Sequence, residues 1–317
     1  MLIRLKVKGG LGNQLSQISF AYKILKQYDE ASLIIDKSIY KKKIKRNFKF
    51  GKFISKTNTF KFFLDELPVS KIYSLNNKFS IFEKIVFSIH DLLLFILKLI
   101  ELILRIFGIK VIQKKIFLFL GKFGLLTDDN RSYLDFGKSL IPLITISGYF
   151  QDLNYHKQNR DIFREFFLKK PEPTDAAFSD KLNNNFQNIS FLLRLNDDKV
   201  FNYSVDNFLS KAYSIISDLN YETNNIFFSD NHNKLSKIKK KFNSPIYCIE
   251  KDPLVQLNLA ANSKIFVISA SSFAWWAYFL SSNEKKIVIK PSIWKIDSPL
   301  WSPGFFIRDE IYNIETN

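Results

Sequence analysis

Short apolar runs alternate with helical segments along the second half of the sequence, and this alternation constrains the fold most. The apolar runs that predict strands lie at 189–195, 226–228, 246–249, 264–268 and 286–290. The segments with helical periodicity lie between them, at 204–218, 233–242, 253–262 and 272–281. Short buried strands separated by helices predict a parallel sheet that helices cover on both faces. A sheet of this kind binds ligands beyond the carboxyl ends of its strands.

The first half begins in the same way and then departs from the pattern. A strand at 2–8, a glycine turn, a helix at about 13–27 and a strand at 32–35 make one βαβ unit. An apolar region at about 80–123 then predicts a helical insertion. A chain of 317 residues suits two domains of ordinary size. We therefore expect an α/β protein with an N-terminal domain at 1–160, carrying the insertion, and a C-terminal domain at 161–317.

The insertion contains a strongly apolar helix at 91–107. Its charged residues are Asp91, Lys98, Glu101 and Arg105, which form one narrow stripe on a helix. Charges recur too often for a transmembrane span, which needs about 20 mostly apolar residues. Two alternatives remain: the helix is buried in a helical subdomain, or it lies in a membrane interface.

Charge and cysteine usage narrow the class of protein. Lys and Arg total 47 against 30 acidic residues, a formal net charge of +17. Nucleic acid, an anionic membrane surface or phosphorylated substrates would suit that charge. The basic clusters at 41–46 and 237–241 come without a nucleic-acid recognition motif, and each also suits a solvated surface. One cysteine and no secretory signal lead us to expect a cytoplasmic protein.

The first candidate ligand site follows the first strand. Gly10, Gly12, Asn13 and Gln14 belong to the turn Gly-Gly-Leu-Gly-Asn-Gln that begins at Gly9. Glycines at a strand–helix turn let backbone amides approach a ligand, and a helix N-terminus favours an anion. The alternative interpretation is a tight turn with Asn13 near a helix cap.

Three further candidates lie at predicted strand ends in the second half. Arg194 ends an apolar strand, where it suits phosphate oxygens or a salt bridge to Asp197. Ser271 and Ser272 suit a helix cap or a phosphate site. Asp230 suits either a helix cap or a hydrogen bond to a ligand. No D-x-D, H-E-x-x-H or cysteine cluster is present, so we expect no metal.

These segments resemble, in order, the motifs of the galactoside α-1,2-fucosyltransferase family. The opening G-G-L-G-N-Q-L-S-Q resembles the family's G-G-L-G-N-Q-L/M-F-Q, and Asp36 looks like the acidic residue that ends its second strand. G-Y-F-Q-D with Tyr155 is similar to G-Y-F/W-Q-S-x-x-Y. The later matches are 192–197 with H-x-R-R-x-D, 227–230 with F-F-S-D, 252–276 with D-x-x-L-M-x-x-C … N-S-x-F-S-W-W, and 286–294 with K-I-V-I-x-P-x-x-W. The resemblance runs from residue 3 to about 294, with a gap at the apolar region.

The resemblance implies a GT-B fold, in which two Rossmann-like domains face one another across a cleft. It implies an inverting transfer of fucose from GDP-fucose to a galactoside hydroxyl, without a metal or other cofactor. By the resemblance, Arg194 binds the diphosphate with help from Ser271 and Ser272. Residues that line the substrate site are Gly10, Gly12, Asn13, Gln14, Asp36 and Gln151. The carboxylates that could act as base are Asp36, Asp152, Asp197 and Asp230, and we expect Asp197 and Asp230 to be catalytic together with Arg194.

The sequence departs from these motifs at several positions. Leu192 and Leu195 stand where the family has His and its second Arg, and Ala270 stands where it has Asn. Two alternatives follow: the same fold with another nucleotide-activated sugar, or an inactive membrane-associated homologue. Family analogy points to an acceptor in a surface glycan or its precursor on a lipid carrier. Peripheral contact with the inner face of the plasma membrane would suit that acceptor.

Overall fold

The computed structural model describes thirteen stretches of the chain. They are 1–28, 31–36, 71–74, 80–106, 119–127, 139–168, 185–195, 204–238, 245–248, 252–269, 271–283, 285–292 and 310–315. Predicted site residue Asp197 and departure position Ala270 lie outside the described residues, as do both basic clusters apart from 237–238. The described residues divide into two compact units, Met1–His156 and Lys157–Asn317.

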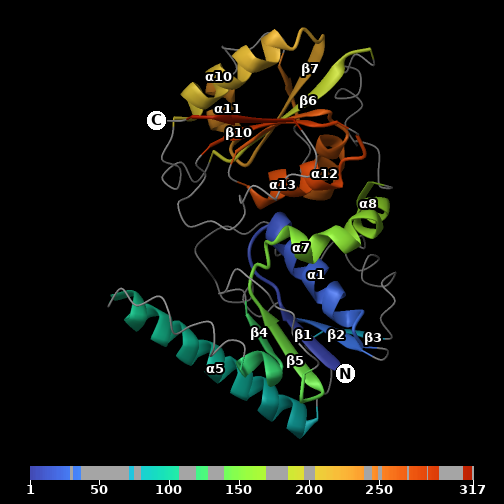
Figure 1. Ribbon diagram of the computed structural model, residues 1–317, viewed down its shortest axis with the longest axis vertical. Coiled ribbons are helices and arrows are strands. Elements are labelled where there is room, and N and C mark those ends of the chain that lie inside the picture. Colours follow the sequence, from blue (N-terminus) through green and yellow to red (C-terminus); the bar gives the residue numbers. More distant parts are fainter. Residues whose placement is uncertain are drawn as a thin grey trace. The chain divides into compact units, whose positions relative to one another are not determined.

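The first unit is built on a parallel sheet with strand order β3-β2-β1-β5-β4 (Figure 1). Its strands are β1 (Leu2–Lys6), β2 (Ser32–Asp36), β3 (Lys71–Ser74), β4 (Leu125–Thr127) and β5 (Leu143–Ser147). Its helices are α1 (Leu11–Leu25), α5 (Ile81–Ile106) and α7 (Leu153–His156). The first strand of the chain therefore lies at the centre of the sheet, between β2 and β5.

The second unit has a six-stranded parallel sheet with strand order β11-β10-β9-β6-β7-β8. Its strands are β6 (Gln187–Leu193), β7 (Thr223–Ser229), β8 (Ile246–Tyr247), β9 (Ile265–Ile268), β10 (Ile287–Pro291) and β11 (Glu310–Ile314). Its helices are the 3-10 turn η1 (Lys157–Asn159), α8 (Arg160–Leu168), α10 (Val205–Asp218), α11 (His232–Ile238), α12 (Pro253–Ala261) and α13 (Ser272–Leu280).

Helices cover both faces of the second sheet. Successive side chains of its strands point to opposite faces, and both faces are largely apolar. Phe191 and Val267 point into a core shared with α10, to which Phe208 belongs. On the other face the Ser190 hydroxyl donates to the Ala260 carbonyl of α12 at 3.3 Å. There too, the ring of Phe266 meets Tyr278 of α13 edge-on. This sheet is doubly wound, as the sequence pattern predicts.

The first unit places α1 and α5 on opposite faces of its sheet (Figure 1). Successive strand side chains point to opposite faces. On β1, Ile3 and Leu5 are fully buried, and Arg4 points to the face that α5 covers. Phe87 of α5 packs with Ile34 and Leu143 on that face.

The predicted α/β class with parallel sheets is confirmed, and most boundaries differ from the prediction by a few residues. Strands β3, β4 and β5 and helices α7 and α8 lie in segments for which the sequence pattern predicts no strand or helix. Two further elements differ. The strand β11 extends the second sheet beyond the strand predicted as the last one. Helix α5 begins at Ile81, ten residues before the predicted start, because Ser80 and Glu83 form a capping box. Among the described helices, none has the length and apolarity needed to cross a membrane.

Candidate functional site

The carboxyl edge of each sheet has one point where the strand order reverses direction. In the second sheet this point lies between β6 and β9, since β7 and β8 follow on one side and β10 and β11 on the other. In the first sheet it lies between β1 and β5. Helices leave the two strands towards opposite faces at such a point, which opens a crevice for ligands.

Arg194 directly follows β6 at the switch point of the second sheet. Its backbone N–H donates to the Ser269 hydroxyl at 2.8 Å, and that hydroxyl donates to the Leu192 carbonyl at 3.0 Å. Ser269 follows β9, so one buried serine holds the ends of both strands at the switch point. The Arg194 side chain is exposed at this edge.

The residue after Arg194 is held from the other side. The Leu195 N–H donates to Oδ1 of Asp230, which follows β7, at 2.7 Å. The Leu195 carbonyl accepts from Nζ of Lys234 on α11 at 2.9 Å. Of the two alternatives for Asp230, the helix cap falls instead to Asn231, whose Oδ1 accepts from the Lys234 N–H of α11 at 3.0 Å. Three neighbouring elements therefore fix the short segment that carries the Arg194 side chain.

The two serines after β9 take different positions at the start of α13. Ser271 is the N-cap, and its hydroxyl accepts from the Ala274 N–H at 3.4 Å. Ser272 is the first helical residue. Trp275 and Trp276 are buried, and Trp276 stacks on Phe163 of α8. These aromatic contacts fix α13, so its N-terminal amides have a defined direction beside β9.

The glycine turn of the first unit connects β1 to α1. Gly9 has φ +83°, and a Cβ there would lie 2.5 Å from Nδ2 of Asn13. Gly10 is the N-cap residue of α1 and has open space where a side chain would begin. Gly12 and Gln14 are buried in the first turn of α1, and Gln14 donates to the Gly9 carbonyl at 3.0 Å. A close approach of backbone and Asn13 side chain thus requires glycine at position 9.

Gln17 joins the two strands at the switch point of the first sheet. Its Nε2 donates to the Lys8 carbonyl at 3.1 Å and to the Gly148 carbonyl at 2.9 Å. Its Oε1 accepts from the Lys8 N–H at 3.1 Å. Gln17 is fully buried. It performs in this unit what Ser269 does in the other, because it ties the ends of β1 and β5 together.

Two predicted site residues, Asn13 and Gln151, contact each other at the same edge of the sheet as Gln17. Gln151 donates from Nε2 to Oδ1 of Asn13, so the turn after β1 and the turn after β5 are directly bonded. Phe150, which precedes Gln151, has φ +48° and stacks on Phe20 with ring centroids 3.9 Å apart. Asp36 ends β2 next to β1 and is 3% exposed. The structure therefore brings Asn13 and Gln151 together, with Asp36 at the same edge and largely buried.

His156 lies buried at the end of this region. Its side chain is fully buried, and its ring lies edge-on to Tyr155. Burial lowers the pKa of His156 to about 3, although the Phe150 carbonyl favours the protonated form. His156 is therefore neutral near pH 7, and its role is packing beneath the turn that carries Gln151.

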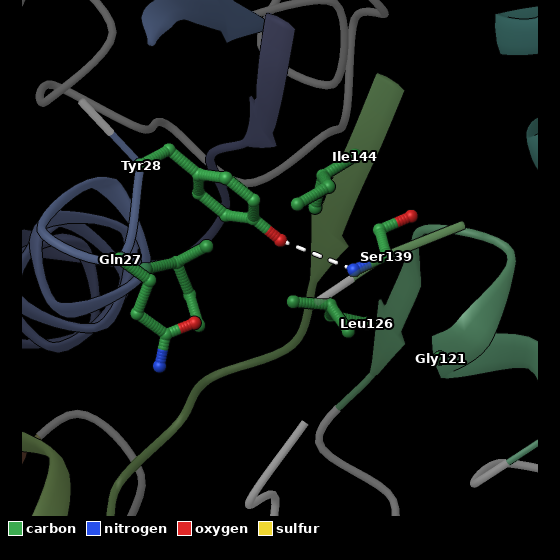
Figure 2. A pocket seen from close by; sticks show the side chains of 7 residues that line it. Gln27, Tyr28, Gly121, Leu126, Ser139 and Ile144 are labelled. Carbon is green, nitrogen blue, oxygen red and sulfur yellow. Dashed lines mark hydrogen bonds between the residues drawn. The ribbon is translucent and has the colours of Figure 1, made fainter. Parts of the chain in front are cut away.

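A small pocket of the first unit lies at the opposite edge of its sheet (Figure 2). Its walls come from the end of α1, with Ile24 and Tyr28, and from Leu126 and Ile144 of the strands. The Tyr28 hydroxyl accepts from the Ser139 N–H at 3.2 Å across it. It lies at the amino ends of the strands, away from Asn13 and Gln151, so it is not the candidate site.

The sequence pattern alone did not identify three of the residues that shape these edges. Ser269 and Gln17 belong to the quoted motifs, and a polar residue directly after a buried strand, or one helical turn beyond a glycine turn, is the signal that could have found them. Lys234 stands in a helix of ordinary basic composition, and nothing in its local sequence distinguishes it. In the described part of the chain, no group of three or more His, Cys, Asp or Glu side chains is arranged to hold a metal ion.

Comparison with known proteins gives one relative in sequence. The chain is 24% identical over 310 residues to the O-antigen biosynthesis glycosyltransferase WbnK of Escherichia coli, and the match covers 91% of this chain and 93% of that protein. No protein-family model matches the chain.

Similar solved structures include two transferases. One is the NodZ α-1,6-fucosyltransferase soaked with GDP-fucose, with 9% identity, a TM-score of 0.44, and coverage of 88% of this chain and 92% of that chain. Another is the ADP-heptose lipopolysaccharide heptosyltransferase II of E. coli, with 11% identity, a TM-score of 0.43, and coverage of 98% and 90%. Both likenesses are distant.

Proposed function

We propose that this protein is an inverting glycosyltransferase that transfers fucose from GDP-fucose to a galactoside hydroxyl, forming an α-1,2 linkage in a surface glycan or its precursor. The observation that carries the proposal is the similarity to an O-antigen glycosyltransferase along 91% of the chain. The ordered α-1,2-fucosyltransferase motifs support the finer donor and linkage. The nucleotide sugar would be a substrate, and the reaction needs no other cofactor.

The switch point of the second sheet suits a nucleotide diphosphate. Arg194 presents a guanidinium group at this edge, and guanidinium binds phosphate oxygens in a bidentate manner. The amides at the start of α13, with Ser271 and Ser272, add the positive end of a helix dipole beside β9. Fixed positive groups of this kind can stabilise the diphosphate as it leaves.

The transfer step follows from these roles. The acceptor hydroxyl oxygen attacks the anomeric carbon of fucose from the side opposite the diphosphate, so the configuration inverts. The bond from that carbon to the phosphate oxygen breaks, and its electron pair leaves with GDP. Arg194 and the α13 amides bind the negative charge that develops there. The hydroxyl proton passes to a carboxylate.

The structure supports Asp230 more than Asp152 as that carboxylate. Asp230 is exposed at the same sheet edge as Arg194, and its Oδ1 bond to Leu195 fixes its position. Asp152 instead caps the short helix α7, because its Oδ1 accepts from the Asn154 N–H at 2.8 Å. Asp36 and Asp197 remain candidates from the motif resemblance. On the first unit, Asn13 and Gln151 with the turn at Gly10 would bind the acceptor.

A donor panel tests the proposal. Purified protein is mixed with GDP, GDP-fucose, GDP-mannose and UDP-, ADP-, dTDP- and CMP-sugars, and its melting temperature is recorded. A ligand that binds the folded state raises Tm according to RT ln(1 + [L]/Kd). We expect a response to GDP and GDP-fucose that Arg194→Ala loses. Lys264→Ala is the matched control, since Lys264 lies at the amino end of β9 in the same unit. A protein that melts cooperatively yet responds to no GDP compound would refute the donor assignment.

A second candidate is the same reaction with another nucleotide-activated sugar. Leu192 and Leu195 stand where the family motif has His and Arg, and both are 3% exposed. Buried leucines offer no polar contact to a donor, so the contacts that select GDP-fucose differ at two positions. A response to a different nucleotide sugar in the same panel, again lost in Arg194→Ala, would favour this candidate.

A further inference from the structure

Helix α5 exposes a continuous apolar face to the outside of the first unit. Among the side chains of α5 that the structure describes, ten large hydrophobic ones are exposed: Ile81, Phe82, Ile85, Ile89, Leu92, Phe95, Ile96, Leu99, Ile100 and Ile103. At 3.6 residues per turn they occupy an arc of about 140° along a helix about 39 Å long. Along that arc of the described helix, Ser88 is the one polar residue. We call these ten side chains the α5 outer face.

The helix contacts its own sheet through polar side chains as well as through Phe87, whereas an ordinary surface helix meets the core with an apolar face. Arg4, on the central strand, donates to the Asp91 carboxylate at 2.5 Å and 3.3 Å. Lys6 donates to the same carboxylate at 2.8 Å. His90 bonds the Thr145 hydroxyl at 2.8 Å.

This docking orients the helix specifically. Arg4 is 4% exposed, and its guanidinium also lies over the Phe87 ring, 4.5 Å from the centroid. A buried charge is destabilising unless it is paired. The sheet therefore contains a buried cation whose partner is on α5, and the resulting ion pair turns the apolar side outward.

The width of the α5 outer face favours lipid over a second helix. The spacing of Ile85, Ile89, Leu92, Ile96 and Leu99 would suit a helix pair. However, such a seam is narrow and is flanked by charged residues. Here Phe95 at one margin and Ile100 at the other are also exposed and apolar. A broad apolar face without charge is the face that interfacial helices insert below the lipid headgroups.

Charge points to an anionic lipid surface. The protein has a formal net charge of +17. Lys84 is exposed beside the α5 outer face, and Lys122 is exposed next to Phe119 and Phe123, whose side chains are exposed as well. The Phe123 carbonyl contacts His90 at 3.1 Å, so these aromatics lie next to α5. Basic residues near an anionic bilayer each add to the attraction.

We propose that α5 is a membrane-docking helix that lies along the surface of an anionic bilayer, with the α5 outer face at the boundary of headgroups and acyl chains. Docking of α5 is separate from the transfer reaction, since it needs neither donor nor acceptor. It predicts peripheral attachment through one helix of the first unit.

Vesicle flotation tests it with the full chain. Purified protein is mixed with vesicles of phosphatidylcholine alone or with about one third phosphatidylglycerol. We expect flotation with the anionic vesicles, weakened by high salt because the basic residues are screened. The double variant Phe95→Glu/Leu99→Glu should bind at least about tenfold more weakly, since it places charge in the apolar layer. Tyr221→Glu, which introduces one Glu at an exposed aromatic of the second unit, is the control and should bind normally.

A second measurement reports on the helix directly. Phe95→Cys is labelled with an environment-sensitive fluorophore, since the native Cys248 is buried. We expect a blue shift when anionic vesicles are added, and no shift for a label at Tyr221→Cys. Three results would overturn the proposal: no flotation, flotation equal in the double variant, or a solution dimer that the double variant dissociates while vesicles have no effect. The last result would assign the α5 outer face to a second copy of the chain.

Discussion

The backbone N–H of Leu195 donates to Oδ1 of Asp230 at 2.7 Å, which links the segment after β6 to the end of β7. Arg194 precedes Leu195, and its N–H donates to Ser269, which directly follows the neighbouring strand β9. The arginine is therefore carried on a backbone that both neighbouring strands hold. A transition-state contact is effective when its supporting backbone is fixed before the substrate binds.

Two substitutions of Asp230 distinguish its hydrogen bond to Leu195 from its proposed role as the base. Asp230→Asn keeps an oxygen that can accept from the Leu195 N–H, so we expect the free energy of unfolding to stay near that of the wild type. Asp230→Ala removes the acceptor and should destabilise the protein by about 1–3 kcal/mol. Turnover should fall about 100-fold or more in both variants if the carboxylate is the base. Urea unfolding and donor-turnover assays measure the two effects, and full activity in Asp230→Asn would exclude Asp230 as the base.

Ser269 is predicted to act as a positioning residue for Arg194. Ser269→Ala leaves the Arg194 N–H without its hydroxyl acceptor and should cost about 1–3 kcal/mol of stability. Because the arginine's backbone is then less fixed, the KM for the donor should rise. Ser269→Thr retains the hydroxyl and should restore the KM. If the donor KM is unchanged in Ser269→Ala while stability falls, the serine has a structural role alone.

The glycine turn offers a matched pair of substitutions. Gly9→Ala forces a side chain into a φ of +83° and against Asn13, so we expect a loss of about 1–3 kcal/mol and weaker acceptor binding. Gly10→Ala adds a methyl group to open space at an N-cap and should cost less than about 1 kcal/mol. Thermal unfolding of the two variants measures the difference. Equal losses would mean that the turn is free to change its backbone conformation.

Stability should fall with acidity because His156 is buried neutral. Its pKa is lowered from 6.5 to about 3 in the folded protein, so the unfolded chain binds one more proton between those values. Unfolding is therefore favoured as pH falls below about 6.5, by up to about 1.4 kcal/mol per pH unit until pH 3. Burial also lowers the pKa of His90, which contributes in the same direction.

Urea unfolding at pH 7.5 and pH 5.5 checks this expectation. His156→Gln cannot take up the proton, so it should lose about 1.4 kcal/mol less than the wild type between these two pH values. An identical pH dependence in the variant would show that His156 is protonated in the folded protein or that its surroundings open easily.

The strand and helix pattern of the second unit could be predicted because each strand is a short apolar run and each helix has its own cap. From this pattern the sequence could also place Arg194 after β6 and Ser271 between β9 and α13. Strand β11, with the sequence Glu-Ile-Tyr-Asn-Ile, lacks such a run and was missed. The order of the strands in the sheet could not be predicted from local sequence patterns either. It depends on the crossover connections, which decide which strands pair.

Partners distant in sequence explain what else was missed. Gln17 bonds a carbonyl 131 residues away, and no local signal indicates that distance. The stripe of Asp91 and its neighbours predicts two faces on α5, but only the buried Arg4 decides which face meets the sheet. The prediction left that choice open between burial and a membrane interface.

The central place of β1 also affects how the protein forms during synthesis. Leu2 lies beside Leu143, so β1 leaves the ribosome about 140 residues before one of its two partner strands. At about 5–20 residues per second, this interval is roughly 7 to 28 s. During that time one edge of β1 is unpaired, and α5 is already complete before its docking surface on β5 exists. Slower translation between α5 and β5 would therefore lengthen the time for which the apolar surface of the nascent chain is exposed. The need for chaperones during synthesis would then depend on this interval rather than on the stability of the finished protein.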